Sequence, residues 1–429
     1  MRKLESAAVV VGAAAISRPK FLVNPVFGLF WTGQTISTLG AQVTAFAVPL
    51  LAALTLHANA FEMGLLRAAE FVPFLVFTLP AGIWADLGIR RNLMISTNLV
   101  RGVFITVVPL LVFIGWMRLE LLYLVMFVMG ALKVIFEMAY QTYVPAIVKR
   151  HELINANSKI MMSYALGQSV GPGFGGVMVE LLGAPLAVLA DASAYFICAF
   201  CLLRIKHQEE KVRPESGGMI SQVIEGFRYV VVHKTIRPLL CLLTANNFFM
   251  NAIMAVLVLY ATGDLGFRPG VFGVIVSVGG CGAVLGAFGA ERLGRWLGPG
   301  PFTVWASGFI AVAAFCFPMV SSCDSVGLFG LAVAYFVLSA GSSSVTVFAW
   351  TIRQTLTSPD MLGKMNGAFR FIVTGIMPFG AVFGGWLAQI CGIRFTLLVS
   401  AVGLLVTALV VSRSRLWSLT SLSGEHEAS

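Results

Sequence analysis

The chain has 429 residues, of which 58% are hydrophobic and only 11% charged, and its formal net charge is +10. A soluble domain has roughly 25% charged residues, so this composition excludes a water-soluble protein and predicts that most of the chain lies in lipid. A net positive charge in a soluble chain would suggest nucleic acid as a partner, so the positions of the Lys and Arg residues decide how it is interpreted.

Twelve apolar runs follow one another along the chain, each near the 20 residues or so that a helix needs to cross roughly 30 Å of hydrocarbon. They are continuously apolar, whereas the strands of a membrane barrel alternate. We therefore predict an all-α integral membrane protein with twelve transmembrane helices. The predicted spans are residues 26–56, 63–85, 93–116, 120–144, 160–182, 185–205, 239–263, 271–292, 301–320, 326–350, 367–390 and 393–413.

Most Lys and Arg residues fall on one side of the membrane if both termini are cytoplasmic. The tails, residues 1–25 and 414–429, are on that side, and only Arg118, Arg268 and Arg394 fall in segments on the other. This bias is the positive-inside pattern, so we expect a cytoplasmic (inner) membrane protein with both termini in the cytoplasm and no nucleic-acid partner. The apolar part of the N-terminal tail is interpreted as tail rather than as a signal peptide.

A charged loop motif follows the second predicted span, in the sequence GIWADLGIRR, and a related motif follows the eighth, in AERLGRW. A glycine in such a motif lets two helices approach closely, and its charges can pair with other charges or with helix ends. The alternative is that the arginines only anchor the loop on anionic lipid. The residues concerned are Gly82, Asp86, Arg90 and Arg91 in the first copy and Glu291, Arg292, Gly294 and Arg295 in the second.

The fifth predicted span contains GxGxxG at Gly171, Gly173 and Gly176. A nucleotide loop lies between a strand and a helix, but this segment lies inside a membrane span, so we exclude a nucleotide. Glycines four residues apart predict close helix packing instead, and proline at position 172 predicts a bend that could act as a hinge. The packing motif comprises Gly167, Gly171, Pro172, Gly175 and Gly176.

A polar stretch, KHQEEKVRPESGG at residues 206–218, separates the first six predicted spans from the last six. An amphipathic pattern follows it, so the predicted cytoplasmic linker, residues 206–238, includes a helix on the inner membrane surface. The displacement of 209 residues that relates Gly171 to Gly380 also relates Gly176 to Gly385. This repeat predicts two pseudo-symmetric six-helix halves, residues 26–205 and 239–413.

Seven charged residues lie three or more residues inside the ends of the predicted spans. Each costs roughly 2.5 to 3.5 kcal/mol at a helix centre, so we expect them to face one another or a polar cavity. Arg67 and Glu70, like Lys133 and Glu137, share a helix face and can form ion pairs within their helices. The set is Arg67, Glu70, Arg101, Lys133, Glu137, Asp191 and Arg370.

These motifs resemble the major facilitator superfamily over nearly the whole chain. Gly82, Asp86, Arg90 and Arg91 match its loop motif, whereas Leu87 and Ile89 depart from it. The segments NPVFGLFWTGQTISTLG at residues 24–40 and MNGAFRFIVTGIMPFGAVFGGWLA at residues 365–388 resemble the branch that holds macrolide-efflux proteins and the enterobactin exporter. The glycines of the fifth span resemble the signature of superfamily antiporters.

The resemblance implies a proton-coupled exporter of small amphipathic molecules, in which the loop charges latch one state and a carboxylate that loses its cation binds a proton. We expect Glu70, then Asp191, then Glu137 to be the coupling acids; static ion pairs are the alternative. Other candidates for lining a substrate cavity are uncharged polar residues in spans one, seven and ten. They are Gln34, Gln42, Asn246, Asn247, Ser342 and Ser343.

An importer or facilitator with the same fold remains open, as does a membrane scaffold that transports nothing. Gly363 and Lys364 form the only Gly-Lys pair and lack the rest of a Walker A motif, and no Ser/His/Asp arrangement can be located. We therefore expect no enzyme activity, no cofactor and no metal site, and a monomer that carries a small-molecule substrate and protons.

Overall fold

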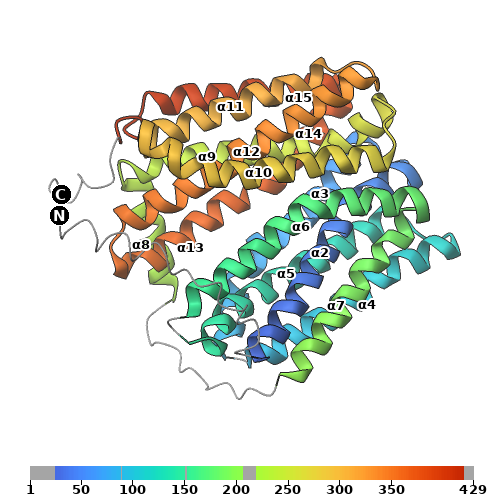
Figure 1. Cartoon of the computed structure of the whole chain (residues 1–429), viewed down its shortest axis with the longest axis horizontal. Helices are drawn as coiled ribbons and strands as arrows, with labels where there is room; N and C mark the ends of the chain where they lie inside the picture. The colour runs from blue at the N-terminus through green and yellow to red at the C-terminus, as the bar shows by residue number, and fades with distance from the viewer. Residues whose placement is uncertain (1–24, 88, 150–151, 206–218, 420–429) are drawn as a thin grey trace, which may run out of the picture.

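The computed structural model describes residues 25–87, 89–149, 152–205 and 219–419, and every regular element in these ranges is a helix (Figure 1). Ten of the helical stretches are long and apolar enough to cross a membrane. Almost all of the predicted N-terminal tail, linker residues 206–218 and the last part of the C-terminal tail lie outside the described residues. The side chains of Asp86 and Glu291 lie outside them too.

The helices gather into two groups, seen in Figure 1 as the blue-to-green helices and the yellow-to-red helices. The first group is α2 (Pro25–Leu50) with its π-helical end η1 (Leu51–Thr55), α3 (Ala60–Leu87), α4 (Arg90–Ile114), α5 (Leu119–Ile147), α6 (Leu153–Leu182) and α7 (Ala184–Arg204). The second is α9 (Ile236–Leu259) with η3 (Tyr260–Asp264), α10 (Pro269–Leu297), α11 (Pro299–Met319), α12 (Ser325–Leu356), α13 (Pro359–Gly375), α14 (Met377–Cys391) and α15 (Ile393–Ser412). Between them in sequence lies α8 (Met219–Val232).

Every predicted span overlaps one or two of these helices, but α3 and α6 are not among the ten apolar stretches. Arg67 and Glu70 lower the hydropathy of α3, and polar and glycine residues lower that of α6. The eleventh predicted span is interrupted, because α13 ends at Gly375 and α14 begins at Met377. Pro378 has no backbone N–H to continue the hydrogen-bond ladder, which accounts for a break at this point.

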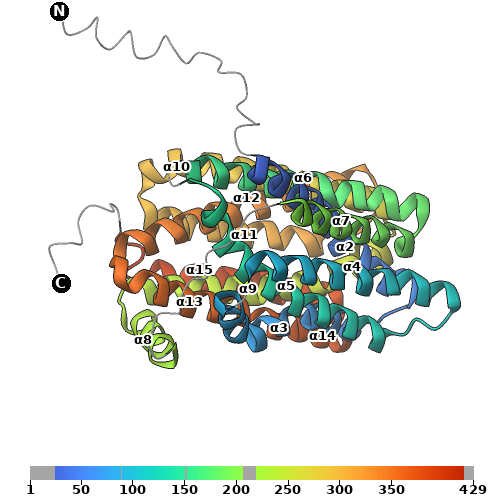
Figure 2. The same cartoon turned by 90° about the horizontal axis from the view of Figure 1, so that it is seen from below.

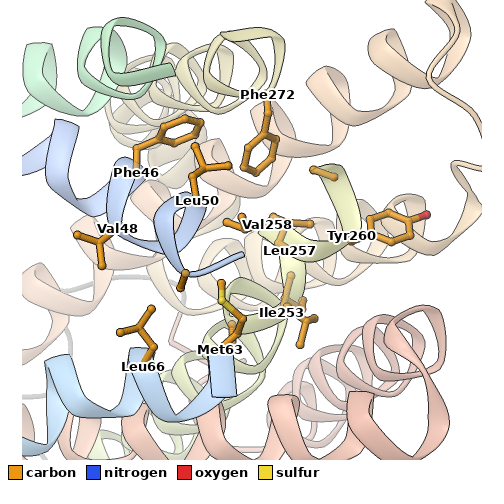
Figure 3. Close-up of a cluster of buried hydrophobic side chains, with 14 of the residues drawn as sticks. Phe46, Val48, Leu50, Met63, Leu66, Ile253, Leu257, Val258, Tyr260 and Phe272 are labelled. Carbon is orange, nitrogen blue, oxygen red and sulfur yellow. The ribbon is translucent and has the colours of Figure 1, made fainter. Parts of the chain in front are cut away.

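One hydrophobic core is shared by the two groups at the end of the bundle where α2 runs into η1 and α10 begins, which we call the far end. Phe46 on α2 and Phe272 on α10 have ring centroids 5.5 Å apart. Figure 3 shows Leu50 and Met63 of the first group facing Val258 of the second. The two groups are therefore held together at the far end by buried apolar surface.

At the opposite end each group has a core of its own. One cluster includes Phe30 and Tyr143 and draws only on the first group, and another includes Ile236 and Phe369 and draws on the second group with α8. Because Arg90, Arg91, Arg204 and Arg413 mark this end, we call it the basic end.

Glycines set the closest approaches between the groups. An added Cβ at Gly176 of α6 would lie 3.0 Å from the Cα of Gly273 on α10. At Gly64 of α3 it would lie 3.0 Å from the Cα of Gly385 on α14. No side chain fits at such separations, so glycine at these sites permits backbone-to-backbone packing.

The linker helix α8 packs beside α13 at the basic end (Figure 2). An added Cβ at Gly226 would lie 2.3 Å from the carbonyl oxygen of Lys364, and Lys364 Nζ lies 2.6 Å from Glu225 Oε2. On the other side of α8, Ile224 and Val231 are exposed. The helix is thus amphipathic, with one face on α13 and an apolar face left open.

Candidate functional site

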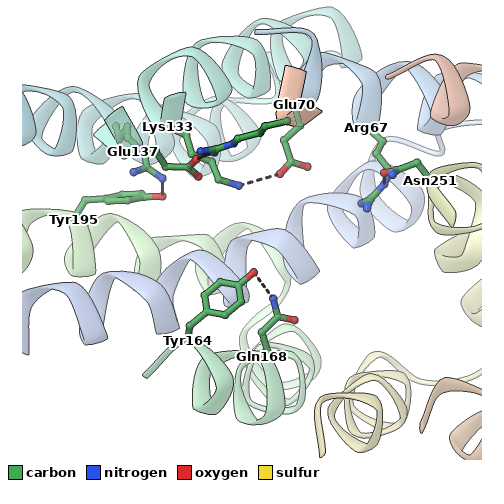
Figure 4. A network of polar contacts seen from close by, with 10 residues as sticks. Arg67, Glu70, Lys133, Glu137, Tyr164, Gln168, Tyr195 and Asn251 are labelled. Atoms are coloured by element: carbon green, nitrogen blue, oxygen red, sulfur yellow. Dashed lines mark hydrogen bonds and ion pairs between the residues drawn. The ribbon is translucent and has the colours of Figure 1, made fainter. Parts of the chain in front are cut away.

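Charged side chains from α3, α5 and α13 face one another between the helix groups (Figure 4). Lys133 Nζ on α5 lies 4.0 Å from Glu70 Oε1 on α3, so this pair joins two helices of the first group. Arg370 on α13 donates to Glu137 Oε2 on α5 at 2.5 Å. The second pair therefore connects the second group to the first.

These partners differ from the ones expected from the sequence. Pairs within one helix, Arg67 with Glu70 and Lys133 with Glu137, were the expectation, but the ion pairs run between helices. The reason is the close contact of α5 with α3: an added Cβ at Gly130 would lie 2.3 Å from the carbonyl oxygen of Glu70. Lys133 lies one turn along α5 from that contact, so its ammonium pairs with the Glu70 carboxylate of α3 and not with the Glu137 carboxylate of its own helix.

Arg67 makes a different contact between the groups. Its Nε donates a 3.0 Å hydrogen bond to Oδ1 of Asn251 on α9, and its guanidinium lies 5.4 Å from the Phe71 ring centroid. Figure 4 shows the two side chains pointing at each other. Arg67 thus has an amide partner in place of the carboxylate that the sequence suggested.

The ion pairs remain partly open to solvent. The side chains of Lys133 and Arg370 are each 40% exposed, and those of Glu70 and Glu137 are 25% and 29% exposed. Exposed ion pairs contribute about 1 kcal/mol or less, because water competes for both charges. Such pairs can separate and form again at little cost.

A second polar cluster is buried inside the first group. Asp191 on α7 is fully buried; neither carboxylate oxygen has a hydrogen-bond partner of good geometry among the described residues, although the Thr44 and Tyr195 hydroxyls lie close enough to interact with it. Thr44 of α2, Tyr195 of α7 and Arg101 of α4 surround it. The Arg101 guanidinium donates to the Tyr195 hydroxyl and lies 4.1 Å from that ring's centroid. A buried carboxylate without a hydrogen bond is costly when charged, which makes this position unusual.

The arginines of the first loop motif contact helices of their own group. Arg90 donates to the carbonyl of Thr142 on α5, and Arg91 donates to the carbonyls of Leu202 and Leu203 at the end of α7. A cation at a helix C-terminus is favourable because of the unsatisfied carbonyls there. In the second motif Arg292 and Arg295 are exposed.

In the second loop motif, Gly294 is required by the packing of α10 against α12. An added Cβ at Gly294 would lie 1.9 Å from Cζ of Phe348, so the absence of a side chain there lets α12 lie against α10. Gly82 lies inside the helical part of α3.

The glycines of α6 lie on two faces. Added Cβ atoms at Gly167, Gly171 and Gly175 would meet α2, and the closest, at Gly171, would lie 2.4 Å from the Cβ of Gln42. Gly176 meets Gly273 of α10, as described above. The helix continues without a break through Pro172, and the next backbone N–H, of Gly173, donates to the Ser277 hydroxyl on α10 at 2.7 Å.

Comparison with known proteins identifies the family. A family model described as transmembrane secretion effector matches residues 18–428. The chain belongs to this family of the major facilitator superfamily. It is accordingly a multi-pass membrane transporter of small substrates and not an enzyme.

Two relatives of this transporter have described activities. The multidrug efflux pump Tap of Mycolicibacterium fortuitum is 25% identical over 383 residues, which cover 86% of this chain and 91% of Tap. The enterobactin exporter EntS of Salmonella typhi is 23% identical over 395 residues, covering 90% and 92%. Among solved structures, a bacterial homologue of the iron transporter ferroportin in an inward-facing state superposes with a TM-score of 0.69 at 16% identity, covering 90% of this chain and 97% of that one.

The uncharged polar residues of the transporter are scattered. Asn247 on α9 donates to the Val373 carbonyl of α13 at 2.9 Å, and Asn246 is buried with its amide 3.4 Å from the Ser307 hydroxyl of α11. Gln34 of α2 accepts from Cys198 of α7. The other candidates are Gln42, which packs on Gly171, and the partly buried Ser342 and Ser343 of α12.

Sequence reasoning missed three residues that link the two groups. They are Asn251, Ser277 and Glu180, whose Oε2 accepts from the Gly270 backbone N–H at 3.0 Å. Asn251 follows Asn247 by one turn in an apolar helix, a signal that could have indicated it. Glu180 lies near the end of a predicted span, where a charged residue costs little and so does not indicate a function. Within the described residues there is no group of three or more metal-binding side chains.

Proposed function

We propose that this transporter is a proton-coupled exporter of small amphipathic molecules that works by alternating access. The observation that carries the proposal is the Glu137–Arg370 ion pair, which joins the two helix groups inside the bundle and is partly exposed. Intramembrane charges are costly and usually functional. A solvent-accessible pair between two moving bodies can break and form again as they rock.

The moving bodies would be two six-helix halves, residues 26–205 and 239–413, with α3 and α6 completing twelve membrane helices. Support comes from their cores, which are shared at the far end and separate at the basic end. With the basic end in the cytoplasm, as the positive-inside rule favours, this is a state closed to the outside. Both termini would then be cytoplasmic, in the inner membrane of the cell, and the protein is proposed to act as a monomer.

Protons are the proposed energy source, with Glu70, Asp191 and Glu137 as the coupling acids. Glu70 has a long, partly exposed contact with Lys133, so a change of side-chain conformation as the halves rock would free its carboxylate to take up a proton. Asp191 differs because it is fully buried, where a charge is costly, and Arg101 is the cation beside it. The arginines of the loop motifs, Arg90 and Arg91 foremost, would hold helix ends in place while the halves move.

Export as the direction, and a macrolide-like drug or siderophore as the substrate, are proposed by analogy. Tap is a multidrug efflux pump and EntS an enterobactin exporter, and both align along most of the chain. The glycine face of α6 that meets α10 suits the same role, because a contact without side chains can open and close as the two halves rock.

The test is accumulation of macrolides, siderophores and dyes in cells that lack their own pumps, with and without a protonophore. Cells with the wild-type protein should accumulate less of at least one compound, and the protonophore should abolish the difference. Glu70→Gln should abolish it too, whereas Glu120→Gln, at an exposed acid of α5, should not. Higher accumulation in expressing cells would contradict export, and low accumulation unaffected by the protonophore would contradict proton coupling.

A further inference from the structure

Arg67 is a cation between the helix groups that has no carboxylate partner among the described residues. Its Nε donates a hydrogen bond to Oδ1 of the neutral Asn251, and its other guanidinium nitrogens form no hydrogen bond with the described residues. Glu70 lies on the same face of α3 but pairs with Lys133. The side chain is half-buried, so the guanidinium is neither fully hydrated nor neutralised by the protein.

The charges nearby do not cancel. Two cations, Lys133 and Arg370, are balanced by Glu70 and Glu137. Arg67 therefore leaves this part of the site with one excess positive charge. An unbalanced charge in a membrane interior is expensive, and such residues commonly interact with a transported solute or ion.

Aromatic rings continue from Arg67 along α3. The guanidinium lies beside the Phe71 ring, and the Phe71 and Phe74 centroids are 6.2 Å apart. From the second group, Tyr335 of α12 lies within the electrostatic range of the Arg67 guanidinium. The Tyr335 hydroxyl donates to the Met254 sulfur at 3.3 Å. These surroundings offer flat apolar surface next to a planar donor that can hold two oxygens at once.

We propose that Arg67, oriented by Asn251, binds the anionic group of the transported substrate. The substrate class is then an amphipathic anion: a carboxylate, a hydroxamate or an ionised catechol attached to an aromatic or apolar body. This inference rests on the proposed transport function and narrows it, because a cationic drug would be repelled by the excess charge. A guanidinium pairs with such groups through two parallel hydrogen bonds, which an ammonium cannot reproduce.

Asn251 offers a variant that changes charge with little change in shape. Asn251→Asp places a carboxylate where the Arg67 Nε already donates, and so neutralises the guanidinium from within the protein. It loses the 2.9 Å hydrogen bond that Asn251 Nδ2 donates to the Asn247 carbonyl, so its folding is checked by melting temperature, and the folded variant should lose the preference for anions. Arg67→Lys keeps the charge without the planar fork and should retain only part of the preference.

The experiment measures equilibrium binding to the purified full-length protein by calorimetry, using 1-naphthoate and its uncharged analogue 1-naphthamide. The wild type should bind naphthoate at least about tenfold more tightly than naphthamide, a difference of about 1.4 kcal/mol. Arg67→Gln and Asn251→Asp should remove the difference. Arg118→Gln, which alters an exposed arginine at the far end, should leave it unchanged. Equal affinity for the two probes in the wild type, including no binding of either, would overturn the proposal, as would a preference that survives Arg67→Gln.

Failure of this inference can be told apart from failure of the proposed function, because the binding measurement needs no proton gradient. Export of cationic ethidium that is unaffected by Arg67→Gln, together with equal naphthoate and naphthamide binding, would leave export standing and remove the anion site. Selective naphthoate binding by a protein that exports nothing would leave the anion site standing and contradict the proposed export.

Discussion

Glu137 and Arg370 belong to different helix groups, yet they form an ion pair at 2.5 Å between α5 and α13. Both side chains are partly exposed, so the pair contributes about 1 kcal/mol or less to the state that contains it. We expect the pair to form in one arrangement of the two helix groups and not in the other. A contact shifts the equilibrium between two conformations only when its free energy differs between them.

Breaking this pair should shift the balance between states. Glu137→Gln should move the equilibrium about fivefold away from the arrangement that contains the pair, which corresponds to about 1 kcal/mol. Exchange of the two charges, Glu137→Arg with Arg370→Glu, should restore much of the lost transport. The measurement is transport by each single variant and by the double variant, and a double variant no better than the worse single one would contradict a pairwise role.

The glycine contact between α6 and α10 should control closure of the far end. Gly176→Ala places a methyl group 2.7 Å from the Pro269 carbonyl oxygen, and overpacking of this kind costs about 1 to 3 kcal/mol. The cost applies only while the far end is closed, so the variant should favour the state in which it is open. Distances between spin labels on α6 and α10 would show the change. Gly289→Ala, at a glycine of α10 where an added Cβ would meet only Leu293 Cδ1 of the same helix, at 4.0 Å, should leave those distances as in the wild type.

Glu180 is expected to act with these glycines. Its carboxylate accepts from the Gly270 N–H at the first turn of α10 and lies 3.9 Å from Arg268. Glu180→Ala removes the acceptor and should weaken the closed far end by about 1 kcal/mol, given the exposure of the pair. Labelling of a cysteine introduced at the far end should become faster, and unchanged labelling would show that Glu180 has no part in closure.

Asp191→Asn tests the buried cluster. The substitution keeps the shape of the side chain but removes the negative charge beside the buried Arg101 guanidinium, so the melting temperature should fall modestly, because the lost attraction is partly offset by the lower cost of burying a neutral group. If Asp191 binds a transported proton, the pH dependence of export should flatten in this variant. A large fall in melting temperature with normal pH dependence would instead indicate a structural role beside Arg101 and Tyr195.

The helices could be predicted from the sequence because their cause is local: apolar runs of the right length dictate them. The partners of the intramembrane charges depend on packing, which one sequence does not reveal. Gly130 illustrates this, since its contact with α3 is what brings Lys133 to Glu70. The α13–α14 break had a readable signal in Gly375 and Pro378, but an apolar run of ordinary length concealed it. Asn251 became significant only once Arg67 was seen to point at it.

Proton-driven export is the central claim, and uphill transport by the purified protein in liposomes tests it most directly. The compound should be the one whose accumulation the protein lowers in cells, with an imposed pH gradient as the only energy source. The account predicts that the wild type moves this compound against its concentration gradient until a protonophore is added. It also predicts that Glu70→Gln only exchanges it across the membrane. Uphill transport without a pH gradient, or undiminished uphill transport by Glu70→Gln, would contradict the account.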